Sequence, residues 1–427
     1  MGKNSIDSLM VDNQKNIRNY NEEGNWGCFL ECDLTYPKSL HNRTNNMILA
    51  PYTRSVERND LSEESLKALH IINPRRNLNN FSEKKLIADF NPRKKYVLHI
   101  SVLKTYLKMG MVLEKIHSGV EFKQANFLSD HIHCLSNLRS NATTKFDKDM
   151  YKLLSNSIYG KFIQNPYLYH RTEFFSSQLD PDISKKVLKR TSSPYFKSIM
   201  PIGTSAVLVD SLPPILKMNQ IVSIGATILD YSKQFMYQMY YANLEPHWGF
   251  GNIDIVMSDT DSFLLKVFSK ESLEKDYFKL SRILDFSKFP KDHPLKKANT
   301  VKANALGYLK DEQNGVSQIT EVIGLQSKCY SYISQSTVKK VKKGFPRRWH
   351  SDLNFSLYKK VLQKGNVMRK TSVSIGSKKQ VLRTYRKHAL TLTNLDTKRY
   401  ILDCKVHSYG FGHKNISLFK GKCLKCN

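Results

Sequence analysis

The residues Asp259-Thr260-Asp261-Ser262 are the feature that most limits what this chain can form. They lie between two mainly apolar stretches, 253–257 and 263–267. Apolar stretches on either side of a short polar turn predict a β-hairpin, with Asp259 and Asp261 at its tip. Carboxylates this close repel each other unless a cation neutralises them, and their oxygens suit divalent cations such as Mg²⁺. An ordinary acidic turn explains the same four residues, and so short a pattern does not decide between the two.

The chain is strongly basic. Its 427 residues include 67 Lys and Arg against 37 Asp and Glu, a net charge of +30. A compact protein with this charge repels itself, which favours a polyanion such as nucleic acid as its partner. From Lys339 to Asn427 the sequence holds 23 basic residues and three aspartates, a net charge of +20. We therefore expect a phosphate-binding surface in this segment, with a solvated charged face as the alternative.

The apolar content, 40% of the residues, is enough for two or three folded domains. No apolar stretch reaches the length of a membrane span, and the N-terminus lacks the apolar core of a signal peptide. We expect a protein of the nucleus or cytoplasm that does not contact a membrane. The run Lys339-Lys340-Val341-Lys342-Lys343 is typical of a nuclear localisation signal or of a phosphate-binding face.

The seven cysteines are odd in number and scattered, which indicates free thiols and not a disulfide framework. Cys423 and Cys426 have the spacing of half a zinc site, but no second pair follows them before the chain ends. The sequence leaves zinc binding by this pair open.

Three segments have apolar residues at helical spacing: 102–111, 145–162 and 221–239. In the third, the repeat of Ile221, Ile224, Ile228, Tyr231, Phe235 and Met239 predicts the face that packs against a sheet. The first two dozen residues are polar and are expected to be disordered. Residues 59–93 have few apolar anchors and are expected to form a surface insertion.

Two further elements carry groups suited to nucleotide chemistry. The predicted strand 28–34 delivers a third carboxylate, Asp33, just before Tyr36 and Pro37. The helix 145–162 presents Lys152 and then Asn156 and Tyr159 in a small-residue stretch that ends at Gly160.

The order of these elements, D-x-x-Y-P, then K-x-x-x-N-S-x-Y-G, then D-T-D-S, resembles motifs A, B and C of family B DNA polymerases. Farther along, 307–312 and 321–330 resemble the palm segment that ends in the K-x-Y primer-binding motif, here Lys328 and Tyr330. The amino-acid sequence of these segments is most similar to the protein-primed branch, in particular to polymerases of Polinton/Maverick-type mobile elements and related viruses. The match runs from about Trp26 to His413.

The resemblance implies an α+β right-hand fold with palm, fingers and thumb. It implies two Mg²⁺ ions bridged by Asp33 and Asp261, with Asp259 in a weaker role. Lys152, and Arg139 about three and a half turns earlier on the same fingers helix, would contact the triphosphate of a deoxynucleotide. The remaining implied contacts are those of Tyr36 with the sugar, Asn156 and Tyr159 with the sugar and base, Lys328 and Tyr330 with the primer end, and Lys342, Lys343, Arg347 and Arg348 with DNA.

The resemblance also divides the chain. The expected parts are a leader at 1–24, palm segments at 25–58 and 207–336, an insertion at 59–95, helical fingers at 96–165, a connecting insertion at 166–206, a basic thumb at 337–415 and a tail at 416–427. The expected partners are a DNA primer-template, deoxynucleotides and, as an option that the sequence leaves open, a priming protein.

Two departures from the family bear on these expectations. The general family has D-x-x-S-L-Y-P as its first motif, so Asp33 and Tyr36 are two residues closer here. Few residues precede Asp33, so we expect a chain without the 3′-5′ exonuclease and without proofreading. Two alternatives stay open. One is a silent nucleic-acid-binding remnant of a mobile element, and the other is a reverse transcriptase, which would carry Y-x-D-D in place of D-T-D-S.

Overall fold

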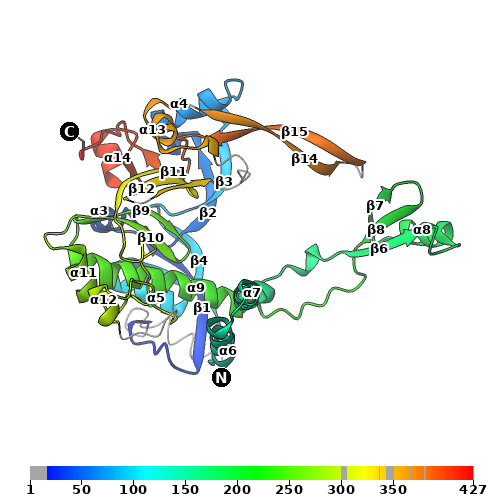
Figure 1. Cartoon of the computed structure of the whole chain (residues 1–427), viewed down its shortest axis with the longest axis horizontal. Helices are drawn as coiled ribbons and strands as arrows, with labels where there is room; N and C mark the ends of the chain where they lie inside the picture. Colours follow the sequence, from blue (N-terminus) through cyan, green and yellow to red (C-terminus); the bar gives the residue numbers. More distant parts are fainter. Residues whose placement is uncertain are drawn as a thin grey trace. The chain divides into compact units, whose positions relative to one another are not determined.

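The computed structural model describes residues 17–299, 305–335, 337–342, 351–365, 367–378 and 381–426. The chain divides into two compact units. Unit 1 comprises residues 1–129, 229–368 and 390–427, and unit 2 comprises 130–228 and 369–389. Both contain helices and antiparallel strands (Figure 1), so the predicted α+β class is confirmed. Among the described residues, no helix combines the length and the apolar character needed to cross a bilayer.

The centre of unit 1 is a three-stranded antiparallel sheet in the order β4-β1-β5. Its strands are β1 (Trp26–Thr35), β4 (Arg93–His99) and β5 (Val112–Lys123). Alternate residues of β1, Cys28, Leu30, Cys32 and Leu34, point into the main core, as a strand with one buried face requires. Helix α5 (Ile100–Lys108) packs on this sheet and confirms the helix predicted near 102–111.

This sheet corrects the interpretation of residues 59–123. Strands β2 (Tyr52–Glu57) and β3 (Ser82–Ile87) pair with each other, and with helix α4 (Glu63–Ile72) they enclose a small apolar core that includes Val56, Leu69 and Phe81. The expectation of a surface insertion with few apolar anchors differs from the structure, in which Leu61 and Ile87 also join this core. Residues 96–123, expected at the start of the helical fingers, instead supply β4, α5 and β5 because β5 pairs along the whole of β1.

The expected leader and the second long helix also differ from the predictions. Residues 1–16 lie outside the described part, but Ile17 is buried in the main core. Helix α9 (Val222–Gln238) continues into a π-helical turn, η5 (Met239–Leu244), and α10 (Glu245–Trp248). Its buried residues include Met236 and Tyr237, whereas Ile221 and Phe235 are exposed. Met239 of the predicted face is buried, but the earlier buried positions include the polar residues Asp230 and Gln234, which hydrogen-bond to the His99 N–H and to Thr105, so the apolar repeat did not mark the buried face.

The acidic hairpin and the K-x-Y segment lie in separate small sheets of unit 1. Strands β9 (Ile253–Asp259) and β10 (Ser262–Val267) form the first, and Ile253 joins the same core as Leu34. Strands β11 (Ile319–Gln326), β12 (Cys329–Ser334) and β13 (Val338–Lys342) form the second, covered by helix α13 (Phe355–Lys364). The smaller elements of unit 1 are η1 (Lys38–Leu40), α3 (His41–Thr44), η2 (Arg58–Asp60), η3 (Leu78–Asn80), α11 (Leu273–Lys279), α12 (Pro294–Lys297), β16 (Tyr400–Ile401), β17 (Ser408–Tyr409) and α14 (Lys414–Phe419).

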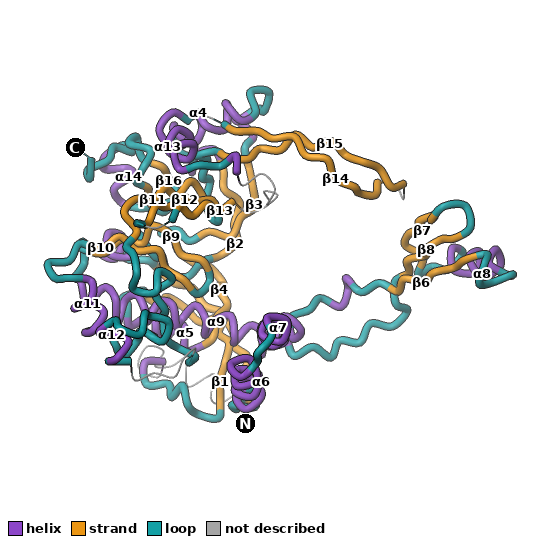
Figure 2. Tube along the Cα trace, in the orientation of Figure 1, coloured by secondary structure: helices purple, strands orange, loops and turns teal. Residues whose placement is uncertain are grey.

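Unit 2 contains the predicted basic helix, α7 (Lys145–Phe162), with the bounds that its sequence pattern gave. Thr144 begins it as an N-cap, because its hydroxyl accepts a hydrogen bond from the Asp147 backbone N–H at 3.0 Å. The other elements are α6 (Ser129–Asn141), η4 (Pro166–Leu168), β6 (Arg171–Ser176), α8 (Ile183–Thr191), β7 (Phe196–Ile202) and β8 (Ala206–Ser211). A long hairpin of β14 (Met368–Lys378) and β15 (Val381–Leu392) completes the fold (Figure 2).

Candidate active site

Asp33 lies where the ladder of β1 is irregular on both sides. Opposite it, β4 supplies two residues, Lys94 and Lys95, where a regular ladder has one. The pairing with β5 also shifts on either side of Cys32 and Asp33. Irregularities of this kind redirect side chains and are frequent next to active sites. They give Asp33 hydrogen-bond donors from both neighbouring strands.

Three donors hold the Asp33 carboxylate. The Lys95 backbone N–H and His117 Nε2 contact Oδ1 at 2.8 and 2.9 Å, and Lys94 Nζ contacts Oδ2 at 3.0 Å. The Lys95 hydrogen bond, followed by those of His117 and Lys94, keeps the pKa of Asp33 well below its ordinary value. The site therefore stabilises Asp33 as an anion, the form that a metal ligand must take.

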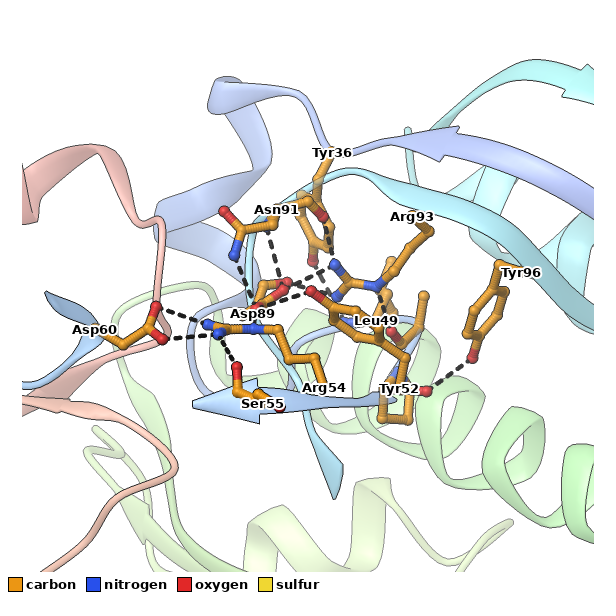
Figure 3. Close-up of polar contacts among 12 residues, drawn as sticks. Tyr36, Leu49, Tyr52, Arg54, Ser55, Asp60, Asp89, Asn91, Arg93 and Tyr96 are labelled. Carbon is orange, nitrogen blue, oxygen red and sulfur yellow. Dashed lines mark hydrogen bonds and ion pairs between the residues drawn. The ribbon is translucent and has the colours of Figure 1, made fainter. Parts of the chain in front are cut away.

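A buried ion pair, drawn in Figure 3, lies at the start of β4, the strand that also carries Lys94 and Lys95. Arg93 and Asp89 are fully buried, with Arg93 Nη1 2.8 Å from Asp89 Oδ1. Arg93 also donates through Nε to the Ala50 carbonyl at 2.7 Å, and its guanidinium stacks 4.1 Å from the centre of the Tyr52 ring. Because Arg93 directly precedes Lys94 and Lys95, this network determines where the donors to Asp33 lie.

Tyr36 is a core residue in this structure. Its side chain is 5% exposed, and its hydroxyl donates to Thr44 Oγ1 at 2.6 Å and accepts from the Leu49 N–H at 3.4 Å (Figure 3). Its ring packs edge-on against Phe90, with the ring centres 5.0 Å apart. In this arrangement the ring faces the protein interior and not an open sugar site, which favours a structural part for Tyr36.

The predicted hairpin with two aspartates at its tip is confirmed. Asp259 ends β9, Ser262 begins β10, and the two residues pair across the turn. The turn is tight: the Asp261 N–H donates to the Asp259 carbonyl at 2.7 Å, and Thr260 has a left-handed φ of 59°. Asp261 is exposed, so its carboxylate is accessible.

The structure brings the K-x-Y motif to this hairpin. Lys328 lies in the turn between β11 and β12, and its Nζ is 2.8 Å from Asp259 Oδ2. Tyr330, two residues later in β12, lies nearly parallel to the Tyr332 ring at a centroid distance of 6.4 Å. Two motifs about seventy residues apart in the sequence thus meet through one ion pair.

The three aspartates are not gathered into one metal-ready group. Within the described ranges, Asp33, Asp259 and Asp261 do not form a set whose ligand atoms all lie within 4.8 Å of one another. Their oxygens nevertheless have the chemistry that Mg²⁺ prefers. Lys94 and Lys328 neutralise Asp33 and Asp259 in this structure, as a cation of the reaction would. The three carboxylates are therefore suitable ligands for magnesium, but their positions in this structure do not form a complete magnesium site.

The expected nucleotide-binding residues of unit 2 lie on two helices. Lys152, Asn156 and Tyr159 share one face of α7 at helical spacing, and all three are exposed. Arg139 is exposed on α6, so the expectation of one continuous helix was wrong. The chain leaves the helical conformation at 142–144, where the Thr144 cap starts a new helix.

The expected DNA contacts of the basic segment are only partly described. Lys342 ends β13 and pairs with Cys329 of β12. Lys343, Arg347 and Arg348 lie outside the described residues.

Sequence reasoning missed Lys94 and His117 as partners of Asp33. Their contacts span 61 and 84 residues of sequence, and neither belongs to a recognisable motif. A weak signal was the basic run 93–95 at the start of a strand, where a surface strand would alternate basic with apolar residues.

Comparison with protein families gives one match. Residues 34–242 match the family described as DNA polymerase type B, organellar and viral. This part of the chain is similar to type B DNA polymerases. The matched range begins one residue after Asp33, contains α7, and ends before the acidic hairpin. No curated protein and no solved structure matches the chain. The polymerase family implies the polymerase fold, metal-dependent catalysis, and binding of DNA and nucleotides.

Proposed function

We propose that the chain is a DNA polymerase that extends a primer 3′-hydroxyl with deoxynucleotides, of the protein-primed kind found in Polinton/Maverick-type mobile elements and related viruses. The contact between Lys328 and Asp259 carries this proposal. It joins two polymerase motifs that both lie outside the range matched by the family. This contact supports a polymerase arrangement that extends into the part of unit 1 that the family match does not cover.

The carboxylates of Asp33, Asp259 and Asp261 would hold two Mg²⁺ ions. When bound, such ions lower the pKa of the primer 3′-hydroxyl and neutralise the triphosphate and the leaving pyrophosphate. The protein's part is to keep Asp33 ionised through Lys95, His117 and Lys94, and to present Asp261 at an exposed tip. No nucleophilic side chain is required, because the primer supplies the attacking oxygen.

Cationic and aromatic side chains would bind the nucleotide and the primer. Lys152 of α7 and Arg139 of α6 are exposed donors for triphosphate oxygens, and Asn156 and Tyr159 share the Lys152 face. Lys328 and Tyr330 would hold the primer end. The basic segment with Lys342, Lys343, Arg347 and Arg348 would bind phosphates of the duplex by releasing counterions.

Primer extension tests this function. Asp261→Asn and Asp33→Asn should each lower Mg²⁺-dependent extension by about a thousand-fold, because metal-bound charge stabilises the transition state by several kcal/mol. DNA affinity should stay within a few-fold of the wild type. Asp292→Asn, at an exposed aspartate outside the site, is the matched control. Equal rates for Asp261→Asn and Asp292→Asn would show that the acidic hairpin is not catalytic.

A DNA-binding remnant without synthesis is the second candidate, and the separation of the three aspartates favours it. It predicts primer-template binding by the wild type with no incorporation at any Mg²⁺ concentration, on DNA primers and on hydroxyl-bearing protein primers alike. Incorporation that depends on Asp261 excludes it.

A further inference from the structure

Four side chains with soft ligand atoms converge in the last part of unit 1. Cys404 and His407 lie in the loop that joins β16 to β17, and Cys423 and Cys426 follow helix α14. Their three sulfur atoms and one imidazole nitrogen all lie within 4.8 Å of one another. The pattern is C-x-x-H followed, after fifteen residues, by C-x-x-C. The pair that the sequence left as half a site therefore has a partner pair, which precedes it in the chain.

The distances match tetrahedral coordination. His407 Nδ1 lies 3.5 Å from Cys404 Sγ and 3.4 Å from both Cys423 Sγ and Cys426 Sγ. One ring nitrogen carries a single hydrogen or a single lone pair, so it cannot form hydrogen bonds with three thiols. Zinc bonds of about 2.3 Å to sulfur and about 2.05 Å to nitrogen, at tetrahedral angles, place nitrogen and sulfur about 3.5 Å apart.

Backbone contacts hold the two pairs together. The His407 N–H donates to Cys404 Sγ at 3.3 Å, the kind of outer contact that orients a thiolate ligand. The Asp403 carboxylate accepts from the Cys423 N–H at 2.9 Å, and the Asp403 N–H donates to the Gly421 carbonyl at 3.2 Å. Asp403 therefore joins the loop with the first pair to the segment with the second.

We propose that Cys404, His407, Cys423 and Cys426 bind a structural Zn²⁺ ion. Four protein ligands close the coordination sphere, which is the mark of a structural and not a catalytic zinc site. Three thiolates and an imidazole select zinc over magnesium, so this site is chemically distinct from the aspartates. The proposal does not depend on the proposed polymerase activity.

The position of the cluster indicates what the ion would stabilise, namely the packing of the C-terminal segment beside β9. His407 and Cys423 line a cavity of about 690 Å³ together with residues 254–258 of β9. Lys425, between two of the ligands, places its Nζ 3.6 Å from Asp254 Oδ1, which also accepts a hydrogen bond from Asn46 at 2.9 Å. Zinc would fasten residues 402–426 beside the strand whose last residue is Asp259.

Metal analysis of the purified full-length chain is the direct test. We expect inductively coupled plasma mass spectrometry to find one zinc ion per chain. Exchange with Co²⁺ should give the visible absorption of tetrahedral thiolate coordination. Cys423→Ser and Cys404→Ser should lose zinc. Cys134→Ser, at an exposed cysteine of α6 outside the cluster, should keep it.

Wild-type protein without stoichiometric zinc and without the cobalt spectrum would overturn the proposal, as would Cys423→Ser that retains zinc like Cys134→Ser. A disulfide between two of the cluster cysteines in the non-reduced protein would also overturn it. If the cysteine variants do not fold, a chelator titration of the wild type decides. Zinc release should lower the thermal unfolding midpoint, and added zinc should restore it.

Discussion

Lys94 occupies the side of the Asp33 carboxylate that a metal ion would need. Its side chain is 73% exposed and its ammonium contacts Oδ2, whereas Lys95 contributes only its backbone N–H. The two lysines are adjacent and exposed, and they differ in whether the side chain reaches the carboxylate. They therefore offer a matched pair for separating competition with the metal from general loss of charge.

We predict that Lys94→Met lowers the Mg²⁺ concentration needed for half-maximal primer extension, because a competing cation is removed from Asp33. Lys95→Met keeps the backbone donor and should leave this concentration unchanged. Magnesium titrations of the two variants and the wild type measure the effect. The same half-maximal concentration in both variants would mean that Lys94 does not compete with magnesium.

At the scale of single elements, the protonation of His99, the N-cap residue of α5, makes the stability of the fold depend on pH. Its Nδ1 accepts from the Ser101 N–H at 3.2 Å and caps the helix. Burial lowers its pKa from 6.5 to about 4, and the carboxylates of Asp230 and Glu22 oppose this shift without cancelling it. The folded state therefore keeps His99 neutral at pH values where the unfolded chain binds a proton.

We predict that the free energy of unfolding falls as pH is lowered from about 6.5 to about 4, by up to about 1.4 kcal/mol per pH unit from His99 alone. His99→Asn keeps a capping oxygen and removes the titrating ring. It should lower stability at every pH but flatten this slope. Urea unfolding at several pH values gives both quantities. An unchanged slope in His99→Asn would assign the pH dependence to other groups.

The contribution of ion pairs to stability should differ between the buried Arg93–Asp89 pair and the partly exposed Arg76–Glu83 pair. Arg93→Leu removes one of the two arginines that pair with Asp89 and leaves the Ala50 and Asp89 carbonyls without their donor, so it should cost about 3 kcal/mol. Arg76→Leu breaks a pair whose side chains are 34% and 33% exposed and should cost less than about 1 kcal/mol. Denaturant unfolding measures both. Similar costs would show that Arg54 alone compensates the buried Asp89 charge.

The elements differ in how far the sequence could predict them. The bounds of α7 followed from its apolar period, a local signal, and the Thr144 cap found in the structure agrees with them. The acidic hairpin followed in the same way. The buried face of α9 did not, because it carries the polar residues Asp230 and Gln234, which an apolar repeat does not mark. Lys94, His117 and the pairing of Cys404 with Cys423 depend on contacts between distant segments, which no local pattern encodes.

At the scale of the whole molecule, the basic C-terminal segment should set the salt dependence of DNA binding. Arg383 and Arg386 of β15 are exposed and described. We predict that Arg383→Glu/Arg386→Glu weakens primer-template binding and flattens the slope of log affinity against log salt by about 0.9 per lost phosphate contact. Lys288→Glu/Lys291→Glu makes the same charge change at exposed sites outside the segment. Equal slopes in the two double variants would assign the effect to net charge alone.

Thr260 and Lys328, the turn residues of the two hairpins that meet at Asp259, have φ angles of 59° and 57°. Glycine or asparagine adopts this conformation at lower cost, and a strained residue costs about 1–3 kcal/mol. Laboratory evolution that screens only for heat tolerance should therefore accumulate Thr260→Gly and Lys328→Asn. The second change removes the ammonium that contacts Asp259. A campaign to make this chain a robust reagent would have to screen synthesis in every round, because two of the residues with left-handed φ lie at its acidic tip.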